Sequence, residues 1–301
     1  MLGVVNLDKP VGPTSHDMVG LLRRLTGTRR IGHAGTLDPL ASGVLPILVG
    51  AATRFSEELT GGRKRYDAVV RLGLRSATDD AEGVLEPGGP IPERGAVEAV
   101  IPSFVGTFEQ RPPAFSARKS GGRTAHRAAR AGTPLDVPPR RVTVESIEVL
   151  GYAEGDGWLD VRLDVRCGPG TYIRSIARDL GERLGSGGHL ASLRRTEAAG
   201  LHVVDAVTPE ALEALAADGR LAEAVLPVAD LLRLPRLSLA GEDAARFRHG
   251  SQVRSPAGTA PGRHAVLVGD ELLGIGMVAD AMLQPEKVLP AEAAAEAEAP
   301  A

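Results

Sequence analysis

Hydrophobic and polar residues alternate along several stretches of the chain, and this two-residue period predicts β-strands. The clearest case is residues 159–167, where four Leu and Val residues and Cys167 alternate with Asp and Arg residues. Residues 66–75 alternate in the same way, apolar runs predict strands at 3–7 and 44–49, and residues 141–150 are strand-like. The alternating strands each present one apolar face and one charged face, and Cys167 falls on an apolar face that packs in the core.

Apolar residues at helical spacing predict helices between these strands. One helix begins at the N-cap candidates Thr14 and Ser15 and ends at Gly27, a residue suited to a C-cap. Thr171 can cap a second helix, whose apolar stripe extends to Leu184. Further helices are predicted at residues 51–59, 93–104 and 209–225.

A second domain is predicted from residue 232 to residue 289. It contains a capped helix at 238–248, and a hairpin of strands 264–268 and 271–279 around the turn pair Gly269-Asp270. The last twelve residues, 290–301, contain only Ala, Glu and Pro, and this composition is typical of disorder.

The overall composition excludes several classes of protein. The chain has 301 residues, 43% of them hydrophobic, but no run of eighteen apolar residues and no signal-peptide pattern. We therefore expect a cytoplasmic protein that does not cross a membrane. The single cysteine excludes an internal disulfide and a cysteine-based zinc site. The sequence shows no metal-ligand spacing and no dinucleotide-binding motif.

Charge is distributed unevenly around the small net value of −3. Residues 1–200 carry 27 Lys and Arg against 23 Asp and Glu, whereas residues 201–301 carry 8 against 15. Between residues 111 and 141 there are eight cations and one anion, Asp136. A solvated charged face usually mixes signs, so this segment indicates binding to a polyanion.

One carboxylate, Asp38, lies in a segment built as a loop. Two glycines precede it, and Pro39 disfavours helical backbone at Asp38 itself. The predicted strand 44–49 follows, so Asp38 lies on a stiff loop at the end of a strand, a usual place for functional residues. Taken by themselves, these features fit an ordinary Asp-Pro turn better than a catalytic site.

The full segment, IGHAGTLDPLASGVLP at residues 31–46, closely resembles the active-site motif of the TruB family. These pseudouridine synthases modify uridine 55 in the T loop of tRNA. In that family the aspartate of the motif is catalytic, and this role falls on Asp38. The resemblance covers about residues 3–200. It implies a pseudouridine synthase fold of the α/β (α+β) type, with a mixed, mostly antiparallel sheet and flanking helices.

Other motifs of the family carry further implied roles. Lys64-Arg65-Tyr66 resembles its KRY motif, in which the tyrosine stacks on the target base. The segment GTYIRSIARDLGE at residues 170–182 resembles the motif whose arginine pairs with the catalytic aspartate, which implies an Arg174–Asp38 pair. A cation near the start of a helix opposes the helix dipole, so Arg174 also requires a partner anion on physical grounds. The resemblance further implies RNA contacts for His33, Tyr172 and Leu193.

The N-terminal segment LDKPVGPTS also resembles a family motif, and it contains Lys9. The phosphate-binding pattern GxxxxGK[ST] is absent, so we expect Lys9 to support the active-site loop or to bind a phosphate of the RNA.

Residues 109–141 resemble the family's RNA-clamping insertion, with Phe115 where tyrosine is usual. Its cations are expected to contact RNA phosphates. The RNA-contacting residues expected there are Phe115, Arg118, Lys119 and Arg123.

The implied function is the isomerisation of uridine to pseudouridine in the T stem-loop of tRNA, without cofactor or metal. Asp38 either attacks covalently or assists a proton abstraction that yields a glycal. The alternatives are a non-catalytic RNA-binding or RNA-folding protein and a guide-RNA-dependent relative of the same family. We expect a monomer with a catalytic domain at 1–231, a C-terminal PUA-like domain at 232–289 and a tail at 290–301.

Overall fold

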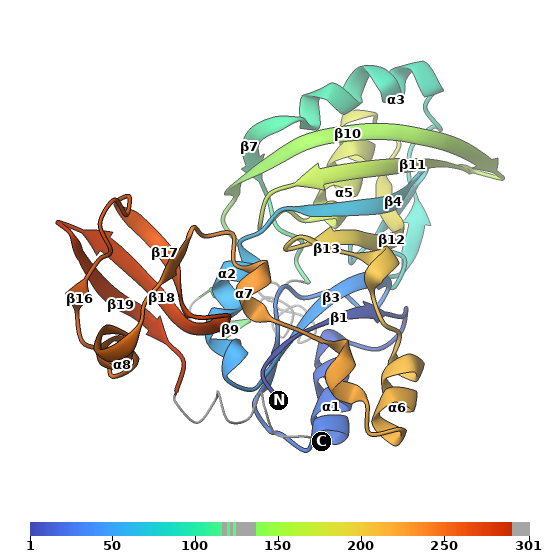
Figure 1. The fold of residues 1–301 in the computed structure, drawn as a ribbon. Helices are drawn as coiled ribbons and strands as arrows, with labels where there is room; N and C mark the ends of the chain where they lie inside the picture. The colour runs from blue at the N-terminus through green and yellow to red at the C-terminus, as the bar shows by residue number, and fades with distance from the viewer. Residues whose placement is uncertain (116–118, 121–122, 125–136, 291–301) are drawn as a thin grey trace. The chain divides into compact units, whose positions relative to one another are not determined.

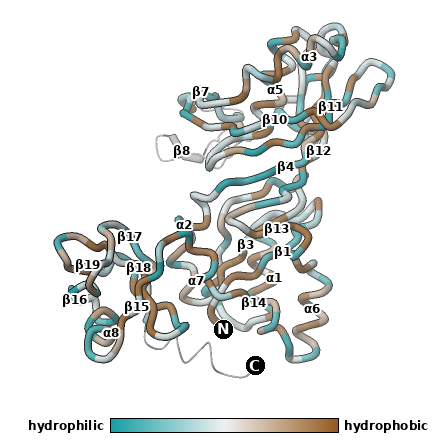
Figure 2. Tube along the Cα trace, turned by 45° about the horizontal axis from the view of Figure 1, so that its top comes forward, coloured by the Kyte–Doolittle hydropathy of each residue, from teal (hydrophilic) through white to brown (hydrophobic). Residues whose placement is uncertain are grey.

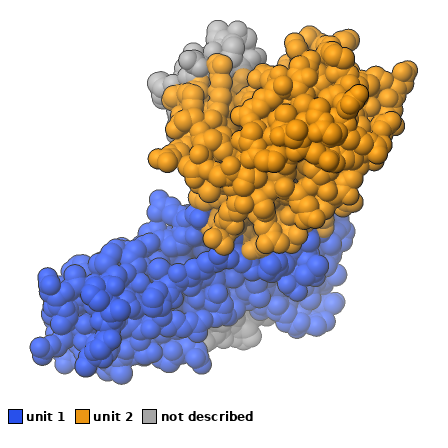
Figure 3. All heavy atoms as spheres, turned by 90° about the horizontal axis from the view of Figure 1, so that it is seen from above, with its two compact units in different colours: residues 1–38, 44–61, 199–301 blue, residues 39–43, 62–198 orange. Residues whose placement is uncertain are grey.

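The computed structural model describes residues 1–115, 119–120, 123–124 and 137–290. By contacts between Cα atoms the chain divides into two compact units, coloured separately in Figure 3. The first contains residues 1–38, 44–61 and 199–301, and the second contains residues 39–43 and 62–198. This division does not follow the domain boundaries expected from the sequence, which stay a prediction.

The first unit contains a small group of strands and several helices (Figure 1). Its strands include β1 (Gly3–Lys9), β2 (Ile31–His33), the end of β3 (Ala41–Val49), β13 (Leu201–His202) and β14 (Val225–Leu226). Its helices are α1 (Ser15–Thr26), α2 (Ser56–Thr60), α6 (Pro209–Ala217) and α7 (Val228–Leu231), with 3-10 turns η1 (Gly50–Phe55), η3 (Val203–Asp205) and η4 (Leu221–Ala224). The segment expected as one helix at 51–59 is therefore a 3-10 turn followed by a short α-helix.

Helix α1 has the ends that its sequence predicts. The Thr14 hydroxyl accepts a hydrogen bond from the N–H of Asp17, and the Asp17 carboxylate accepts one from the N–H of Thr14. This capping box satisfies two amides that the first turn leaves without helical partners. At the other end Gly27 adopts the left-handed conformation, with φ of 66°.

A separate five-stranded sheet in the first unit contains the predicted C-terminal hairpin. Its strand order is β15 (Arg236–Ser238), β17 (Gly262–Val268), β18 (Glu271–Ala279), β19 (Met282–Val288) and β16 (Val253–Arg254). Helix α8 (Gly241–Arg248) packs on this sheet (Figure 1), and Phe247 joins Val266 and Leu283 in its own apolar core. Val268 pairs with Glu271 across Gly269-Asp270, which confirms the predicted hairpin turn.

Charged side chains connect this sheet to helix α2. Glu58 accepts hydrogen bonds from Arg263 at 2.9 Å and from Lys287 at 3.0 Å. Burial raises the pKa of Glu58, but the bonds from these two cations outweigh it and leave that pKa below its ordinary value. The C-terminal sheet is therefore attached to α2 through paired charges.

The second unit is built on a sheet with the order β3, β12 (Gly188–Ala198), β4 (Lys64–Leu72), β11 (Trp158–Cys167), β10 (Arg140–Gly155) and β7 (Gly106–Gln110). Only the β3–β12 pair in this series is parallel. The unit also contains α3 (Arg94–Val100), η2 (Ile101–Phe104), α5 (Ile173–Arg183) and the two-stranded pairs β5 (Leu74–Ser76) with β6 (Leu85–Pro87) and β8 (Lys119–Ser120) with β9 (Arg123–Thr124). The expected mixed, mostly antiparallel sheet is confirmed.

The two faces of strands β4 and β11 differ as the alternation predicts. Tyr66, Ala68 and Val70 are buried on one face, and Cys167 is buried on the same face. The other face carries ion pairs between neighbouring strands, such as Arg65–Asp164 and Arg71–Asp160. Figure 2 shows the first part of β4 as hydrophilic, because Lys, Arg, Tyr and Asp begin the strand. Cross-strand charge pairs of this kind each contribute about 0.2–1 kcal/mol.

Helix α5 packs against β12 and β4 and begins differently from the prediction. Thr171 does not cap it, because the Thr171 hydroxyl donates instead to the carbonyl of Gly168. The N-cap position is Tyr172, whose side chain forms no capping hydrogen bond. The sequence also predicts a short basic helix that ends at Gly132, and its segment 125–132 lies outside the described residues. The predicted tail lies outside them as well, except for residue 290.

Gly43 allows the parallel strands β3 and β12 to approach closely. Its φ is 101°, and a Cβ atom there would overlap the backbone of Arg195. Gly258 also has a positive φ, of 79°, but has open space around it. Both substitutions strain a backbone with positive φ, but only an alanine at position 43 also clashes with a neighbouring strand. We therefore expect Gly43→Ala to lower the free energy of unfolding by about 1–3 kcal/mol more than Gly258→Ala does. Urea unfolding of both variants tests this, and equal losses would contradict the close approach.

Candidate active site

The loop that carries Asp38 is held by a side chain of helix α1. The Ser15 hydroxyl donates to the carbonyl of Leu37 at 2.9 Å and accepts from the N–H of Leu37 at 2.8 Å. Ser15 is buried, and Leu37 directly precedes Asp38. Pro39 restricts the backbone on the other side. The half-buried carboxylate therefore stands between two fixed residues.

His33 and Lys9 lie in the same unit as Asp38. His33 is half-buried at the end of β2, opposite Ile47 of β3. Lys9 is fully buried, and its ammonium donates to the carbonyls of Pro10 at 2.7 Å and Pro13 at 2.8 Å. These bonds favour the loop-supporting role for Lys9 over a phosphate contact.

Tyr66 and Leu193 lie on neighbouring strands of the second unit. Tyr66 of β4 is buried and pairs with Val165 on one side and Arg195 on the other. Leu193 of β12 is buried opposite Ala68, two residues along β4 from Tyr66. The sheet thus brings the two expected base-contacting residues onto adjacent strands.

Two buried cations accompany Tyr66. Lys64 precedes it by two residues on β4, and Arg195 lies opposite it on β12. Burial, aided by the charge of Arg195, lowers the pKa of Lys64 to about 8. On the neighbouring strand, burial raises the pKa of Cys167 to about 11, so this thiol is protonated and unreactive at neutral pH.

Arg174 is the second residue of α5 and is buried. Its guanidinium donates to the carbonyls of Thr78 at 3.2 Å and Phe115 at 2.9 Å. It also lies 3.5 Å from the carboxylate of Asp80, which is equally buried. Asp80 is therefore a partner anion of the kind that a cation at a helix start requires. The pair between Arg174 and Asp38 stays a prediction.

The turn that presents Asp80 is tightly bonded. The Asp80 carboxylate accepts hydrogen bonds from the Thr78 hydroxyl at 2.5 Å and from the N–H of Glu82 at 3.1 Å. The neighbouring Asp79 has a positive φ of 61° and accepts from Arg178, one helical turn after Arg174, at 2.9 Å. Burial raises the pKa of Asp79 above its ordinary value, against the opposing effect of these arginines. The sequence analysis did not identify Asp79 or Asp80 as partners of these arginines. Two adjacent carboxylates after a threonine, Thr78-Asp79-Asp80, were the pattern that could have indicated them.

The remaining expected residues are Tyr172, next to α5, and four residues of the insertion. Tyr172 is half-buried directly before α5, and Phe115 is half-buried with its carbonyl bonded to Arg174. Lys119 and Arg123 belong to the paired strands β8 and β9, but their side chains are outside the description. Arg118 lies outside the described residues altogether.

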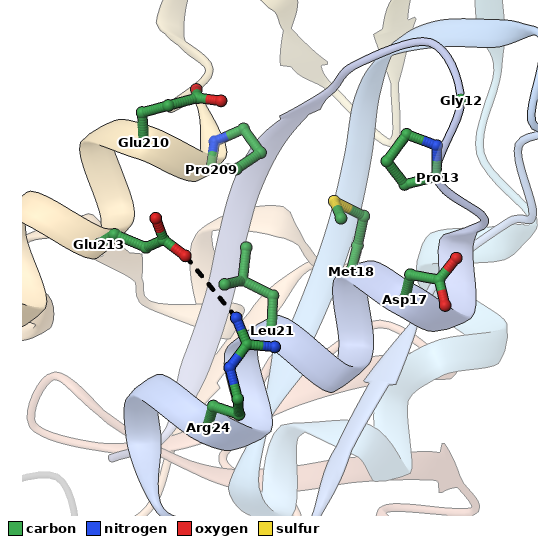
Figure 4. A pocket seen from close by; sticks show the side chains of 9 residues that line it. All are labelled: Gly12, Pro13, Asp17, Met18, Leu21, Arg24, Pro209, Glu210 and Glu213. Atoms are coloured by element: carbon green, nitrogen blue, oxygen red, sulfur yellow. Dashed lines mark ion pairs between the residues drawn. The ribbon is translucent and has the colours of Figure 1, made fainter.

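A groove of about 540 Å³ lies between helices α1 and α6 (Figure 4). Met18 and Leu21 contribute apolar surface, whereas Asp17, Glu210 and Glu213 contribute carboxylates. Arg24 is the single cation in its lining and lies 3.7 Å from Glu213. This excess of negative charge disfavours a nucleic acid, so we do not assign the groove to RNA.

Within the described ranges, no group of three or more His, Cys, Asp and Glu residues could hold a metal ion. A search of the same ranges finds no helix long and apolar enough to cross a membrane.

Comparison with known proteins identifies close relatives. Residues 23–173 match the description "TruB family pseudouridylate synthase (N terminal domain)", and residues 174–233 match "tRNA pseudouridylate synthase B C-terminal domain". The tRNA pseudouridine synthase B of Acaryochloris marina is 42% identical over 97% of this chain and 100% of its own. That of Ralstonia nicotianae is 43% identical over 95% of this chain and 94% of its own.

Chains in two solved structures superpose on this chain over nearly its whole length. A Cbf5-Nop10-Gar1 complex contains a chain of 29% identity that superposes with a TM-score of 0.71, covering 96% of this chain and 86% of that one. An H/ACA RNP bound to a substrate RNA gives a TM-score of 0.70 at 28% identity, covering 96% of this chain and 85% of that one.

Replacing Asp80 with Asn should destabilise the fold by about 3 kcal/mol, because it leaves the buried charge of Arg174 without its neighbouring carboxylate. Asp230→Asn is the matched control, because Asp230 forms an exposed pair with Arg236, worth at most about 1 kcal/mol. Thermal or urea unfolding measures both. Similar losses for the two variants would show that the Asp80–Arg174 pair is not a buried support.

The lowered pKa of Lys64 predicts a pH dependence of stability. Between about pH 8 and 10.4 the unfolded chain retains the Lys64 proton that the folded chain loses, so folding stability rises with pH. We expect wild type to gain on the order of 2 kcal/mol over this range relative to Lys64→Met. Lys287→Met should show no such difference, because the pKa of Lys287 is raised instead. A constant wild-type advantage over Lys64→Met from pH 7 to 10 would contradict the lowered pKa.

Proposed function

The chain belongs to the TruB family of pseudouridylate synthases, and from this premise we propose that it acts on uridine 55 in the T loop of tRNA. It is an isomerase that converts uridine in tRNA to pseudouridine, and it has the pseudouridine synthase fold. The choice of the T stem-loop rests on the motif around Asp38. We further propose a monomeric, cytoplasmic enzyme.

The observation that carries the proposal is the construction of the Asp38 loop. Ser15 fixes Leu37 by two hydrogen bonds, and Pro39 restricts the next step of the chain. A half-buried carboxylate held in this way loses little freedom when a substrate arrives, and such preorganisation favours catalysis. An ordinary surface turn has no need of a buried serine that bonds both main-chain groups of one residue.

The reaction exchanges one bond for another within the nucleoside. The bond from N1 of uracil to the sugar breaks, the base rotates and C5 bonds to the sugar. The C5 proton then leaves and N1 takes up a proton, so the product is an isomer of uridine. The uridine must first leave its stack, at a cost of a few kcal/mol. In the proposal Asp38 acts on the nucleoside, Tyr66 stacks on the extruded base, and His33 fills the vacated space.

The second unit supplies the surroundings of the base in this proposal. Leu193 and Tyr172 contact the uracil, and Arg174 pairs with Asp38 to keep that carboxylate ionised and oriented. Asp80 lies 3.5 Å from Arg174 and restrains its guanidinium. The insertion, with Phe115, Arg118, Lys119 and Arg123, grips the RNA stem through phosphate contacts.

A stand-alone mode of action is favoured over dependence on a guide RNA. The segment 111–141 carries eight cations against one anion, so the chain has its own means of holding a substrate RNA. The relatives that it matches over nearly all of their length are named for tRNA modification.

Asp38→Asn tests the proposal directly. Tritium release from C5-labelled uridine in a T stem-loop RNA should fall at least about 1,000-fold, because the substitution removes the reacting carboxylate while keeping its size. Asp218→Asn, at the exposed C-terminus of α6, serves as control and should retain full activity. RNA binding by wild type without tritium release would contradict the choice of the T stem-loop. Full release by Asp38→Asn would contradict the role of the carboxylate.

A further inference from the structure

The insertion leaves and rejoins the sheet at a pair of facing residues. Gln110 is the last residue of β7 and Arg140 is the first of β10, and the two are directly opposite in the antiparallel ladder. These strands form the edge of the second unit's sheet (Figure 1). We call this pair the neck of the insertion.

The side chain of Gln110 bonds both main-chain groups of Tyr172. Its Nε2 donates to the Tyr172 carbonyl at 3.0 Å, and its Oε1 accepts from the Tyr172 N–H at 2.9 Å. Gln110 is only 1% exposed, so water does not compete for these bonds. A carboxamide carries both a hydrogen-bond donor and an acceptor. The Gln110 side chain therefore satisfies both main-chain groups of Tyr172, as a neighbouring strand would do in a sheet.

Tyr172 has particular need of such support. Its backbone is extended, with φ of −101° and ψ of 113°, yet it belongs to no strand and directly precedes α5. Its own side chain does not cap the helix. Because Arg174 follows two residues later, the direction of Tyr172 also sets how the first turn of α5 presents the guanidinium.

Arg140 contacts the same loop from the other side of the neck. A Cβ atom on Gly170 would overlap the guanidinium of Arg140, so this group packs directly on the Gly170 backbone. Gly170 has a φ of 82°, a conformation that favours glycine. Both residues of the neck therefore hold the loop that leads into α5.

Helix α5 in turn bonds the first residues of the insertion. The Ser175 hydroxyl and the Arg178 guanidinium each donate to the carbonyl of Arg111 at 2.9 Å. Arg174 donates to the carbonyl of Phe115. The start of the insertion is thus attached to the face of α5 that carries Arg174.

We propose that Gln110 is a positioning residue of the active site, which holds Tyr172 and the start of α5 in place and links them to the RNA-binding insertion. The inference rests on the proposed function, because it takes Tyr172 and Arg174 to act at the uracil. Gln110 itself touches neither the RNA nor the reacting atoms. Its loss slows the chemical step, while the cations of the insertion still hold the RNA.

Gln110→Met tests this by separating rate from affinity. Methionine has nearly the same length and shape but forms neither hydrogen bond. The single-turnover rate at saturating T stem-loop RNA should fall about 10–100-fold, the scale of a small misplacement in an active site. The dissociation constant should change by no more than about twofold. Gln284→Met, at an exposed position of β19, is the matched control and should change neither value.

A double-mutant cycle shows whether Gln110 acts through Tyr172. If it does, Gln110→Met combined with Tyr172→Ala should slow the reaction by less than the product of the two single losses. Independent, multiplicative losses would overturn the proposal. So would a wild-type rate in Gln110→Met, or a loss confined to RNA affinity.

Gln110→Glu guards against misfolding of the methionine variant. It keeps the acceptor for the Tyr172 N–H but replaces the donor to the Tyr172 carbonyl with a carboxylate oxygen, which repels that carbonyl. A loss of rate at least as large as that of Gln110→Met, at unchanged affinity, is expected. Thermal unfolding and circular dichroism confirm that each variant is folded before its rate is interpreted. Failure of wild type to form pseudouridine in this RNA would reject the proposed function, whereas a normal wild type with a normal Gln110→Met would reject only the role of Gln110.

Discussion

The buried guanidinium of Arg174 is the constraint on which much of the second unit depends. A charge with so little exposure must be paired, and a cation at the start of a helix also opposes the helix dipole. Asp80 supplies the charge, and the carbonyls of Thr78 and Phe115 accept hydrogen bonds. The turn before β6, the first residues of the insertion and the first turn of α5 are therefore organised around one side chain.

Two expected site residues are supported by the same device. Leu37, next to Asp38, has both its N–H and its C=O bonded to the hydroxyl of Ser15. Tyr172 has both groups bonded to the carboxamide of Gln110. Neither Leu37 nor Tyr172 belongs to a helix or strand, so each lacks the ladder that normally satisfies the main chain. A buried polar side chain takes over that task and fixes the functional loop.

The two faces of the sheet in the second unit differ in charge pairing and in burial. Ion pairs cover one face and contribute modestly, because the charges are partly exposed. The other face buries Tyr66 and Leu193 together with the cations Lys64 and Arg195. Burial of the Lys64 ammonium opposes its charged form, as the lowered pKa of Lys64 shows. This face is the one on which the proposed function places the RNA base.

The sequence by itself determined the local elements and the candidate catalytic carboxylate. Alternation identified β4 and β11, capping residues bounded α1, Gly269-Asp270 marked the hairpin, and the motif around Asp38 indicated the reaction. These signals depend on residues close together in the chain. Only the tertiary structure decided the supports of the site. Ser15, Gln110 and Asp80 act on residues that are 22, 62 and 94 positions away, and such long-range bonds leave no periodic trace in the sequence.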